Sequence, residues 1–572
     1  MTNNEMARKR ADEIDSEIIE TLKQGKSFRV EAGAGAGKTY SLMKVIDWLE
    51  KEKRKEFSKF GQHVACITYT NAAVDVIKSR LRDESFIHPC TIHTFAWNTM
   101  KRFQSSLIEA AEKLGIIPTK DNTTEKFAVN EIHKISYELG VRYVQDGELF
   151  LYHDDVIRLF VFLLDKEKFR FILAHEYPII LIDEYQDSFK SIISQFLSFF
   201  IEQDLKPQFG FFGDSWQTIY ISNGACGEVE SSHLTVINKE ANFRSQKVIV
   251  DALNKIRPEL TQITASDDSD GHIFVITSDD YKGNRLTGYY KDELPENELF
   301  SRIEKIRTKL KGFCWTGSQK TLMLTHRMLA KEQNYFQLFE VLGDHLRDAD
   351  DEHFLFFMEK VEPVFDALAQ NNSKMLFEAL GVNRRPIESI EHKIRWKQLL
   401  KDLRTARHGS IYDVLDVVER SRLIGLSDVI SYWLRTYREN GNELYYNKPI
   451  KAFYDISYVE IVNAIRFQFP DSEFSTSHGV KGEEYDNVLF VIGRGWNNYK
   501  FDAELYLNKN KLNGKDLDSY IRNRNLFYVC CSRPKKNLVL FISVPVNSAF
   551  MEYLSNVFGQ DNIMTYSQFM GL

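Results

Sequence analysis

A strand-like run, a glycine-rich turn and a helical run follow one another near the start of this chain, and they constrain its fold more than any other segment. Residues 28–31 are strand-like, residues 40–46 have helical character, and the turn between them reads Ala32-Gly33-Ala34-Gly35-Ala36-Gly37-Lys38-Thr39. Glycines let backbone amides cradle phosphates, while the lysine and threonine that follow reach the outer phosphates and a magnesium ion. This order predicts a phosphate loop between a strand and a helix.

One position departs from the phosphate-loop pattern. The pattern G-x-x-x-x-G-K-[ST] places glycine where this chain has Ala32. A flexible alanine-glycine turn is therefore the competing interpretation. The flanking strand and helix favour the phosphate loop, because phosphate binding uses the N-terminus of a helix.

A second apolar run ends in acidic residues. Residues 178–182 read Pro-Ile-Ile-Leu-Ile, which is typical of a buried parallel strand, and Asp183 and Glu184 follow directly. Chemistry in parallel sheets lies at the carboxyl ends of the strands. Magnesium prefers oxygen ligands and an attacking water needs a carboxylate to orient it, so two adjacent acids can divide these roles. Alone, the acids also fit a solvated loop; beside a phosphate loop they predict nucleotide hydrolysis.

Composition narrows the class of protein. The 572 residues predict three or four domains, and the six cysteines form no C-x-x-C pair, which argues against a zinc ribbon, an iron–sulfur cluster or a secreted disulfide framework. A polar start and short apolar runs predict a cytoplasmic protein without a membrane span. The net charge of −7 means that any nucleic-acid groove must be locally basic. The basic run 51–55 fits either phosphate contacts or a solvated helix end.

Further segments occur in the order of the motifs of superfamily 1 helicases of the UvrD, Rep and PcrA type, and the chain resembles that family. Residues 64–73 resemble motif Ia, and 91–95 the next DNA-contacting motif. Residues 209–220 resemble motif III, 242–245 motif IV, 476–485 motif V and 526–533 motif VI. The signature Asp-Glu-x-Gln-Asp at 183–187 also belongs to this helicase group.

The resemblance implies a role for each matching residue, with ATP and magnesium as cofactors. The implied catalytic residues are Lys38, Asp183, Glu184, Gln217, Arg244 and Arg533, the last as an arginine finger. The implied nucleotide contacts are Ala32, Gly33, Ala34, Gly35, Ala36, Gly37, Lys38, Thr39, Gln186 and Glu484, with Thr39 and Asp183 on the metal. The implied DNA contacts are Tyr69, Asn71, Thr91, His93, Tyr220, Thr476 and His478. Stacking of bases on aromatic rings tolerates any sequence.

The resemblance also implies an α/β fold with two RecA-like parallel sheets that face each other across ATP, each with a helical insertion. The spacing of the motifs predicts a first RecA-like domain at 1–85 and 172–248, with an insertion at 86–171. A second RecA-like domain is expected at 249–330 and 470–545, with an insertion at 331–469 and a tail at 546–572. The acidic, turn-rich segment 262–297 is expected to form an exposed loop or hairpin.

Two departures from the family bear on function. Residues 1–23 contain no glutamine, although the family reads adenine with one before the phosphate loop, so adenine selectivity stays open. The family's DNA-stacking tryptophan in motif III is absent, because this chain continues Tyr220-Ile221-Ser222-Asn223. Trp216 lies nearby, and either DNA stacking or core and interdomain packing explains it.

The short chain and its reduced second insertion resemble the compact helicase subunits of bacterial antiphage systems of the Gabija type. Those subunits work beside an ATPase-nuclease of the OLD family, which makes such a nuclease a candidate partner. About thirty residues follow the last expected strand, too few for an appended nuclease domain. Two functions remain open. One is a motor that moves along single-stranded or tailed DNA, 3′ to 5′ by resemblance, in repair or defence; the other is a DNA-sensing ATPase that licenses a nuclease without processive unwinding.

Overall fold

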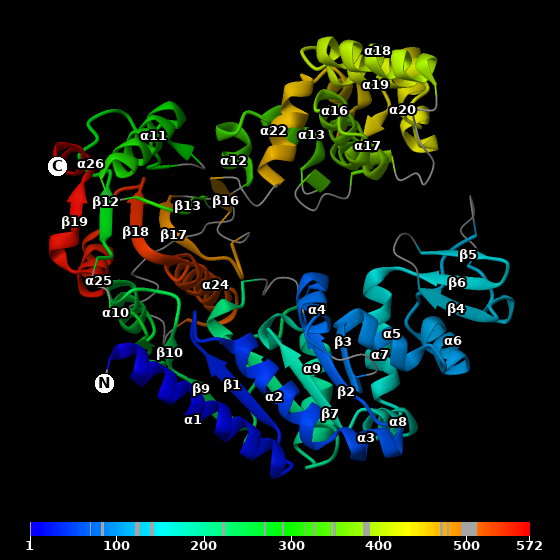
Figure 1. The fold of residues 1–572 in the computed structure, drawn as a ribbon, viewed down its shortest axis with the longest axis vertical. Coiled ribbons are helices and arrows are strands. Elements are labelled where there is room, and N and C mark those ends of the chain that lie inside the picture. The colour runs from blue at the N-terminus through cyan, green and yellow to red at the C-terminus, as the bar shows by residue number, and fades with distance from the viewer. Residues whose placement is uncertain are drawn as a thin grey trace.

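Two parallel β-sheets, each with an insertion, make up the computed structural model of the chain (Figure 1). The structure describes residues 2–68, 70–81, 85–120, 126–137, 142–219, 224–267, 270–288, 291–313, 315–323, 326–343, 345–346, 351–380, 389–468, 473–476, 480–493 and 512–572. The predicted α/β fold with two RecA-like sheets is therefore confirmed. No helix in these ranges is long and apolar enough to cross a membrane.

The first sheet has six parallel strands. Their spatial order is β3 (Ile87–Thr91), β2 (Val64–Thr68), β7 (Ile179–Asp183), β8 (Gln208–Gly213), β1 (Phe28–Ala32) and β9 (Thr235–Lys239). Every residue of β1, β2 and β7 is buried, as expected for apolar strands covered on both faces. The covering helices are α1 (Asn3–Lys23), α2 (Lys38–Glu52), α3 (Arg54–Phe60), α4 (Asn71–Lys78) and α9 (Lys190–Phe196).

The order of the central strands brings the functional segments together. Strands β7, β8 and β1 are neighbours, and all three run in the same direction. Their carboxyl ends therefore lie on one edge of the sheet. The phosphate loop follows β1, the acids end β7, and the turns η2 (Tyr185–Asp187) and η4 (Ser215–Gln217) follow β7 and β8.

The first insertion is not purely helical. It contains α5 (Ile92–Met100), α6 (Gln104–Lys113), α7 (His153–Leu164) and α8 (Glu167–Glu176), together with a small sheet of β4 (Lys134–Tyr137), β6 (Glu148–Leu151) and β5 (Tyr143–Gln145). Strand β3, which the sequence placed inside the insertion at 86–171, pairs with β2 at the edge of the main sheet. Its sequence, Ile-His-Pro-Cys-Thr, is only half-buried and lacks the apolar run of the central strands, which explains the difference.

The second sheet also has six parallel strands. Their order is β16 (Phe474–Thr476), β13 (Gln319–Met323), β17 (Tyr485–Ile492), β18 (Pro534–Ile542), β12 (Ile273–Thr277) and β19 (Ile563–Thr565). The expectation of a loop or hairpin at 262–297 is wrong for β12, which pairs with both β18 and β19. Strand β19 lies in the expected tail at 546–572, so that segment adds a strand to the second sheet. The limits drawn between the domains otherwise remain a prediction.

Helices cover both faces of the second sheet, and its insertion forms a core of its own. The sheet is covered by α10 (Lys247–Ile256), α11 (Glu296–Phe313), α24 (Gly514–Cys531), α25 (Ser548–Phe558) and α26 (Tyr566–Gly571). The insertion contains α12 (His326–Glu332), α13 (Phe336–Leu342), α15 (Glu352–Phe356), α16 (Glu362–Ala369), α17 (Ser373–Leu380), α18 (Ile390–Ala406), α19 (Ile411–Ser421), α20 (Asp428–Glu439), α21 (Ile450–Tyr454), α22 (Tyr458–Gln468) and the hairpin of β14 (Leu444–Tyr445) and β15 (Lys448–Pro449). Figure 1 shows it apart from the first insertion, above it in the view.

The two sheets share a hydrophobic cluster where they meet. Ala34 of the phosphate loop and Trp216 after β8 are buried together with Tyr528 of α24 and residues of α10. Because this cluster includes the phosphate loop, the packing of the two halves bears directly on the candidate site.

Candidate active site

The phosphate loop is held from outside by residues that follow the first sheet. Gly37 takes the left-handed conformation, with φ 76°, just before α2. The carbonyl of Ala34 accepts hydrogen bonds of 2.9 Å from both Asn242 Nδ2 and Gln262 Nε2. Asn242 belongs to the motif IV segment, whereas the local sequence gave no sign that Gln262 would reach the loop.

Gly35 lies where the motif IV segment approaches the loop closely. Its φ is +72°, and a Cβ there would be 2.7 Å from Arg244 Cβ and 2.8 Å from Asn242 Oδ1. These separations are too short for a side chain. Glycine is therefore needed here both for the backbone conformation and for the approach of motif IV.

The acids at the end of β7 face the lysine of the loop. Lys38 Nζ lies 3.6 Å from Glu184 Oε1, and Gln186 Nε2 donates to Glu184 Oε2 at 2.5 Å. Glu184 has left-handed backbone angles, φ 49° and ψ 43°, which cost a non-glycine residue of order 1 kcal/mol and are concentrated at functional sites. Burial alone would raise the pKa of Glu184, but the positive charges of Lys38 and Lys481 hold it below its ordinary value. Glu184 is therefore a carboxylate at neutral pH.

Asp183 has the features expected of a magnesium ligand. Its side chain is buried, and burial together with the charge of Glu184 raises its pKa. A further cation at this position would relieve the repulsion between the two acids. Carboxylate and hydroxyl oxygens suit magnesium, and Thr39 offers a hydroxyl at the start of α2. These residues fit the metal.

Residues of the second half reach the acids and the glutamine of the first. Lys481, which the sequence did not single out for the site, forms an ion pair with Asp187 and donates to the carbonyl of Gln217 at 2.7 Å. Arg533 Nη2 donates to Gln217 Oε1 at 3.3 Å. Arg533 is 1% exposed, and burial, with the nearby charge of Arg244, lowers its pKa to about 10, so it stays protonated at neutral pH.

Arg244 and Glu484 also meet across the interface. Arg244 Nε donates to Glu484 Oε2 at 2.9 Å, and Arg244 Nη1 donates to the carbonyl of Ser532 at 3.2 Å. Lys535 pairs with the other oxygen of Glu484 at 2.8 Å. The structure thus brings four of the six expected catalytic residues into two pairs, Lys38 with Glu184 and Gln217 with Arg533. A fifth, Arg244, pairs with Glu484 instead.

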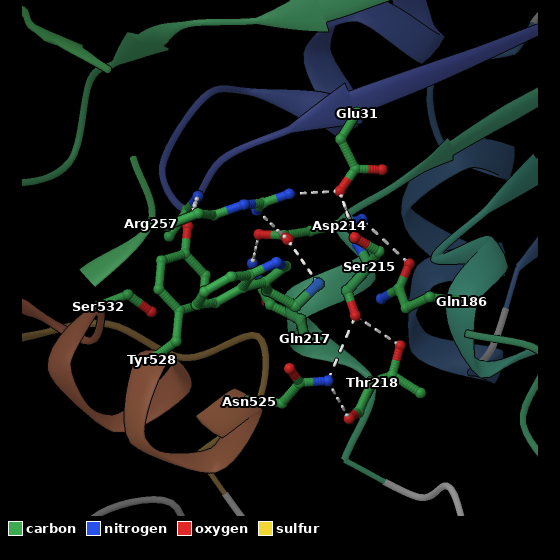
Figure 2. A network of polar contacts seen from close by, with 12 residues as sticks. Glu31, Gln186, Asp214, Ser215, Gln217, Thr218, Arg257, Asn525, Tyr528 and Ser532 are labelled. Carbon is green, nitrogen blue, oxygen red and sulfur yellow. Dashed lines mark hydrogen bonds and ion pairs between the residues drawn. The ribbon is translucent and has the colours of Figure 1, made fainter. Parts of the chain in front are cut away.

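A buried polar network behind the loop contains residues that the sequence did not indicate (Figure 2). Arg257 donates to both Glu31 and Asp214, and its guanidinium lies over the rings of Trp216 and Tyr528. Trp216 is 8% exposed. Of the two interpretations of this tryptophan, the structure supports interdomain packing.

The expected DNA contacts are only partly described. Tyr69, Tyr220 and His478 lie outside the described residues. Asn71 is exposed at the start of α4, Thr91 is the N-cap of α5, and Thr476 is buried at the end of β16. His93 stacks on His153 with 3.4 Å between ring centroids, and burial lowers its pKa to about 4, so its imidazole is neutral.

A cavity of about 640 Å³ joins the expected DNA contacts to the acids. Its lining includes Thr91, His93, His153, Asp183 and Asp187. Among the described residues, two buried atoms on these side chains have no hydrogen-bond partner, His93 Nε2 and Asp187 Oδ1. Buried polar atoms in proteins are normally satisfied, so both are available to a water or a ligand.

Helix α1 precedes the phosphate loop, where the family has the glutamine that contacts adenine, and here one side of the helix is buried against the first sheet. Asp15 is buried in α1 and pairs with Lys239 of β9 at 2.9 Å, and Ser41 of α2 donates to it. Two aromatic residues next to the loop remain open instead, Tyr40 at 60% exposure and Phe243 at 45%. Neither ring is among the nucleotide contacts that the resemblance implies.

Comparisons with known proteins agree with this geometry. A family model described as an AAA domain matches residues 15–223. The chain is 24% identical to the Gabija protein GajB of Bacillus cereus strain HuB5-5, over 95% of this chain and 96% of that protein. It is 27% identical to GajB of strain VD045, over 45% of this chain and 52% of that protein.

A yeast protein is also similar. The match to the mitochondrial ATP-dependent DNA helicase HMI1 of Saccharomyces cerevisiae is 26% identical over 44% of this chain and 41% of that protein. The phosphate loop, the acids of β7 and the residues that reach them from the second sheet fit these similarities. These similarities agree with the resemblance of the motifs to those of superfamily 1 helicases.

Proposed function

We propose that this protein hydrolyses ATP between its two sheets and uses the cycle to move along single-stranded DNA. The observation that carries the proposal is the convergence of Lys481 and Arg533, from the second half, on Asp187 and Gln217 of the first. Closure driven by nucleotide needs charged groups from both halves at one site.

The side chains divide the work of phosphoryl transfer. Lys38 would bind the outer phosphates, and Glu184 would orient the attacking water. Arg244 and Arg533 would stabilise the charge that develops as the phosphoryl group leaves. Magnesium held by Asp183 and Thr39 would neutralise phosphate charge when bound. Tyr40 and Phe243 would offer aromatic faces to the base in place of the absent glutamine.

The cavity beside the acids supports a DNA contact close to the nucleotide. Thr91 and His93 share its wall with Asp183 and Asp187. DNA bound at this wall would be separated from the acids by no more than one side chain. Its binding would therefore change the polarity and charge around these acids. Asp187 is the direct link, because the same carboxylate pairs with Lys481.

A tailed-duplex assay tests the proposal. Purified protein should hydrolyse ATP faster with single-stranded DNA and release a strand from a 3′-tailed duplex, but not from a 5′-tailed one. Lys38→Ala should lose both activities, because the phosphates lose their lysine. Wild-type turnover in Lys38→Ala would overturn the assignment of the loop.

The second function is a DNA-sensing ATPase that licenses a nuclease. It is favoured by the burial of Trp216, which leaves no described tryptophan of motif III to stack on DNA. DNA-stimulated hydrolysis without strand release would support it.

The likeness to GajB supports a role in antiphage defence, with an OLD-family ATPase-nuclease as partner. Co-purification after co-expression with such a nuclease tests that assignment.

A further inference from the structure

Two buried acids at neighbouring strand ends share a single arginine. Glu31 lies in β1 opposite Gly213 of β8, and Asp214 is the next residue. Both acids are buried, at 5% and 0% exposure. Arg257 donates from Nη2 to Glu31 Oε1 and from Nη1 to Asp214 Oδ1, each at 2.6 Å (Figure 2). A planar guanidinium presents a separate nitrogen to each acid in a fixed fork, whereas an ammonium offers one nitrogen on a flexible stem.

This arginine comes from the other half of the molecule. Arg257 directly follows α10, which packs on β18, α24 and α25 of the second sheet. Its two carboxylate partners belong to the first sheet. The guanidinium therefore ties the strand before the phosphate loop and the turn after β8 to the second half at one buried point.

Asp214 also contacts Gln217, one of the expected catalytic residues. Its second oxygen, Oδ2, accepts a hydrogen bond from Gln217 Nε2 at 2.7 Å. With the amide nitrogen held there, Gln217 Oε1 faces Arg533 Nη2 at 3.3 Å. A flipped amide would place its NH₂ group against the guanidinium, so Asp214 selects the orientation that accepts from Arg533.

The same guanidinium also packs against the wall of the phosphate loop. It lies 5.3 Å from the ring centroid of Trp216 and 5.6 Å from that of Tyr528. The hydroxyl of Tyr528 accepts a hydrogen bond of 3.1 Å from the backbone N–H of Ala34. Arg257 thus contacts, directly or through one side chain, both the loop and the glutamine that faces Arg533.

We propose that Arg257 is a positioning residue for ATP hydrolysis. Through Asp214 it fixes the side chain of Gln217 that faces Arg533, and its second bond, to Glu31, holds the guanidinium in place for that contact. The proposal rests on the ATPase function proposed above. The competing explanation is a buried ion pair that only stabilises the fold.

A double-mutant cycle separates positioning from stability. Arg257→Lys keeps a positive charge between the two acids but loses the fork that places one nitrogen on each, so kcat for ATP should fall at least about tenfold while KM changes less than about threefold. In a Gln217→Ala background, Arg257→Lys should have no further effect on kcat, because both changes act through the same side chain. Asp214→Asn replaces one carboxylate oxygen by an NH₂ group. If the amide oxygen accepts from Arg257, the NH₂ group faces Gln217 Nε2, which is also a donor. The kcat of this variant should therefore fall in the same way.

Arg407→Lys is the matched control. Arg407 forms a comparable part-buried pair with Glu362, at 2.6 Å, in the distant second insertion, and its change should leave kcat unaltered. The proposal would be overturned if Arg257→Lys had the wild-type kcat, or if the effects of Arg257→Lys and Gln217→Ala on kcat multiplied. If Arg257→Lys does not fold, an unaltered kcat in Asp214→Asn would overturn the proposal. Absence of hydrolysis by the wild-type protein would instead overturn the ATPase function on which the proposal rests.

Discussion

At the scale of single residues, Glu184 is the side chain that most directly distinguishes hydrolysis from nucleotide binding. It is held as a carboxylate by Lys38 and Lys481 and fixed by Gln186. Glu184→Gln keeps the size of the side chain but loses the base, so ATP hydrolysis should fall by about 10²- to 10⁴-fold while ATP and DNA binding persist. Steady-state turnover and equilibrium binding of a fluorescent ATP analogue test this; lost binding would make Glu184 structural.

Gly35 tests how closely motif IV must approach the phosphate loop. Gly35→Ala would place a Cβ 2.7 Å from Arg244, so ATP affinity and turnover should both fall, as measured by nucleotide titration and kinetics. Gly25→Ala is the control, because Gly25 has a similar φ of +74° but no atom within 4 Å of the added Cβ. It should cost about 1 kcal/mol of stability and leave turnover unchanged. Equal turnover in the two variants would rule out the contact.

Residues in local motifs could be predicted from the sequence, and isolated ones could not. Lys38, Glu184, Gln217 and Arg533 occur in recognisable patterns, and the structure brings them together in pairs. Arg257 has no such pattern, since its partner Glu31 is 226 positions away. A lone charged residue in a sequence gives no sign of burial, so only the fold could show this contact.

At the scale of elements, the sequence predicts those strands that are apolar on both faces. Strands β1 and β7 are buried throughout and were expected, whereas the edge strand β3 is half-buried, begins Ile-His-Pro and was assigned to the insertion. Strand β12 was missed because the acidic turns on either side outweighed its five residues, Ile-Phe-Val-Ile-Thr. Edge strands and strands in turn-rich surroundings depend on partners far away in the sequence.

The second insertion contains a pH-sensitive core. His353 is fully buried in α15, with Nδ1 2.8 Å from the Tyr445 hydroxyl and Nε2 2.8 Å from the Tyr454 hydroxyl. Burial lowers its pKa to about 3, below the value of about 6.5 for an unfolded histidine. The unfolded state therefore binds the proton first, and the stability that His353 contributes above pH 6.5 is lost as pH falls toward 3.

Hydrogen exchange tests this element directly. Between pH 7.5 and 5.5, the opening free energy of α15 and α21 should fall by about 1 kcal/mol more in the wild type than in His353→Gln, which cannot take up the proton. Burial raises the pKa of neighbouring Asp351, which acts in the opposite sense but is present in both proteins. An equal pH dependence in the two proteins would contradict the assignment to His353.

At the scale of the whole molecule, two sheets from distant parts of the chain build one site. The hydrophobic cluster that contains Ala34, Trp216 and Tyr528 joins them, and Lys481, Arg244 and Arg533 cross the boundary as charged contacts. Hydrolysis would therefore depend on the second half even though the phosphate loop and both acids belong to the first. Release of these cross-boundary contacts would separate the halves, which links the chemistry to movement.

The turnover of Arg533→Lys tests this dependence most directly. Lysine keeps the positive charge but loses the fork that donates to Gln217, and an arginine finger contributes about 10³- to 10⁵-fold to turnover. The variant should bind ATP within about threefold of wild-type affinity, yet its DNA-stimulated kcat should fall by at least about 100-fold. Hydrolysis at the wild-type rate would show that the first half alone performs the chemistry, and would contradict a site shared by the two sheets.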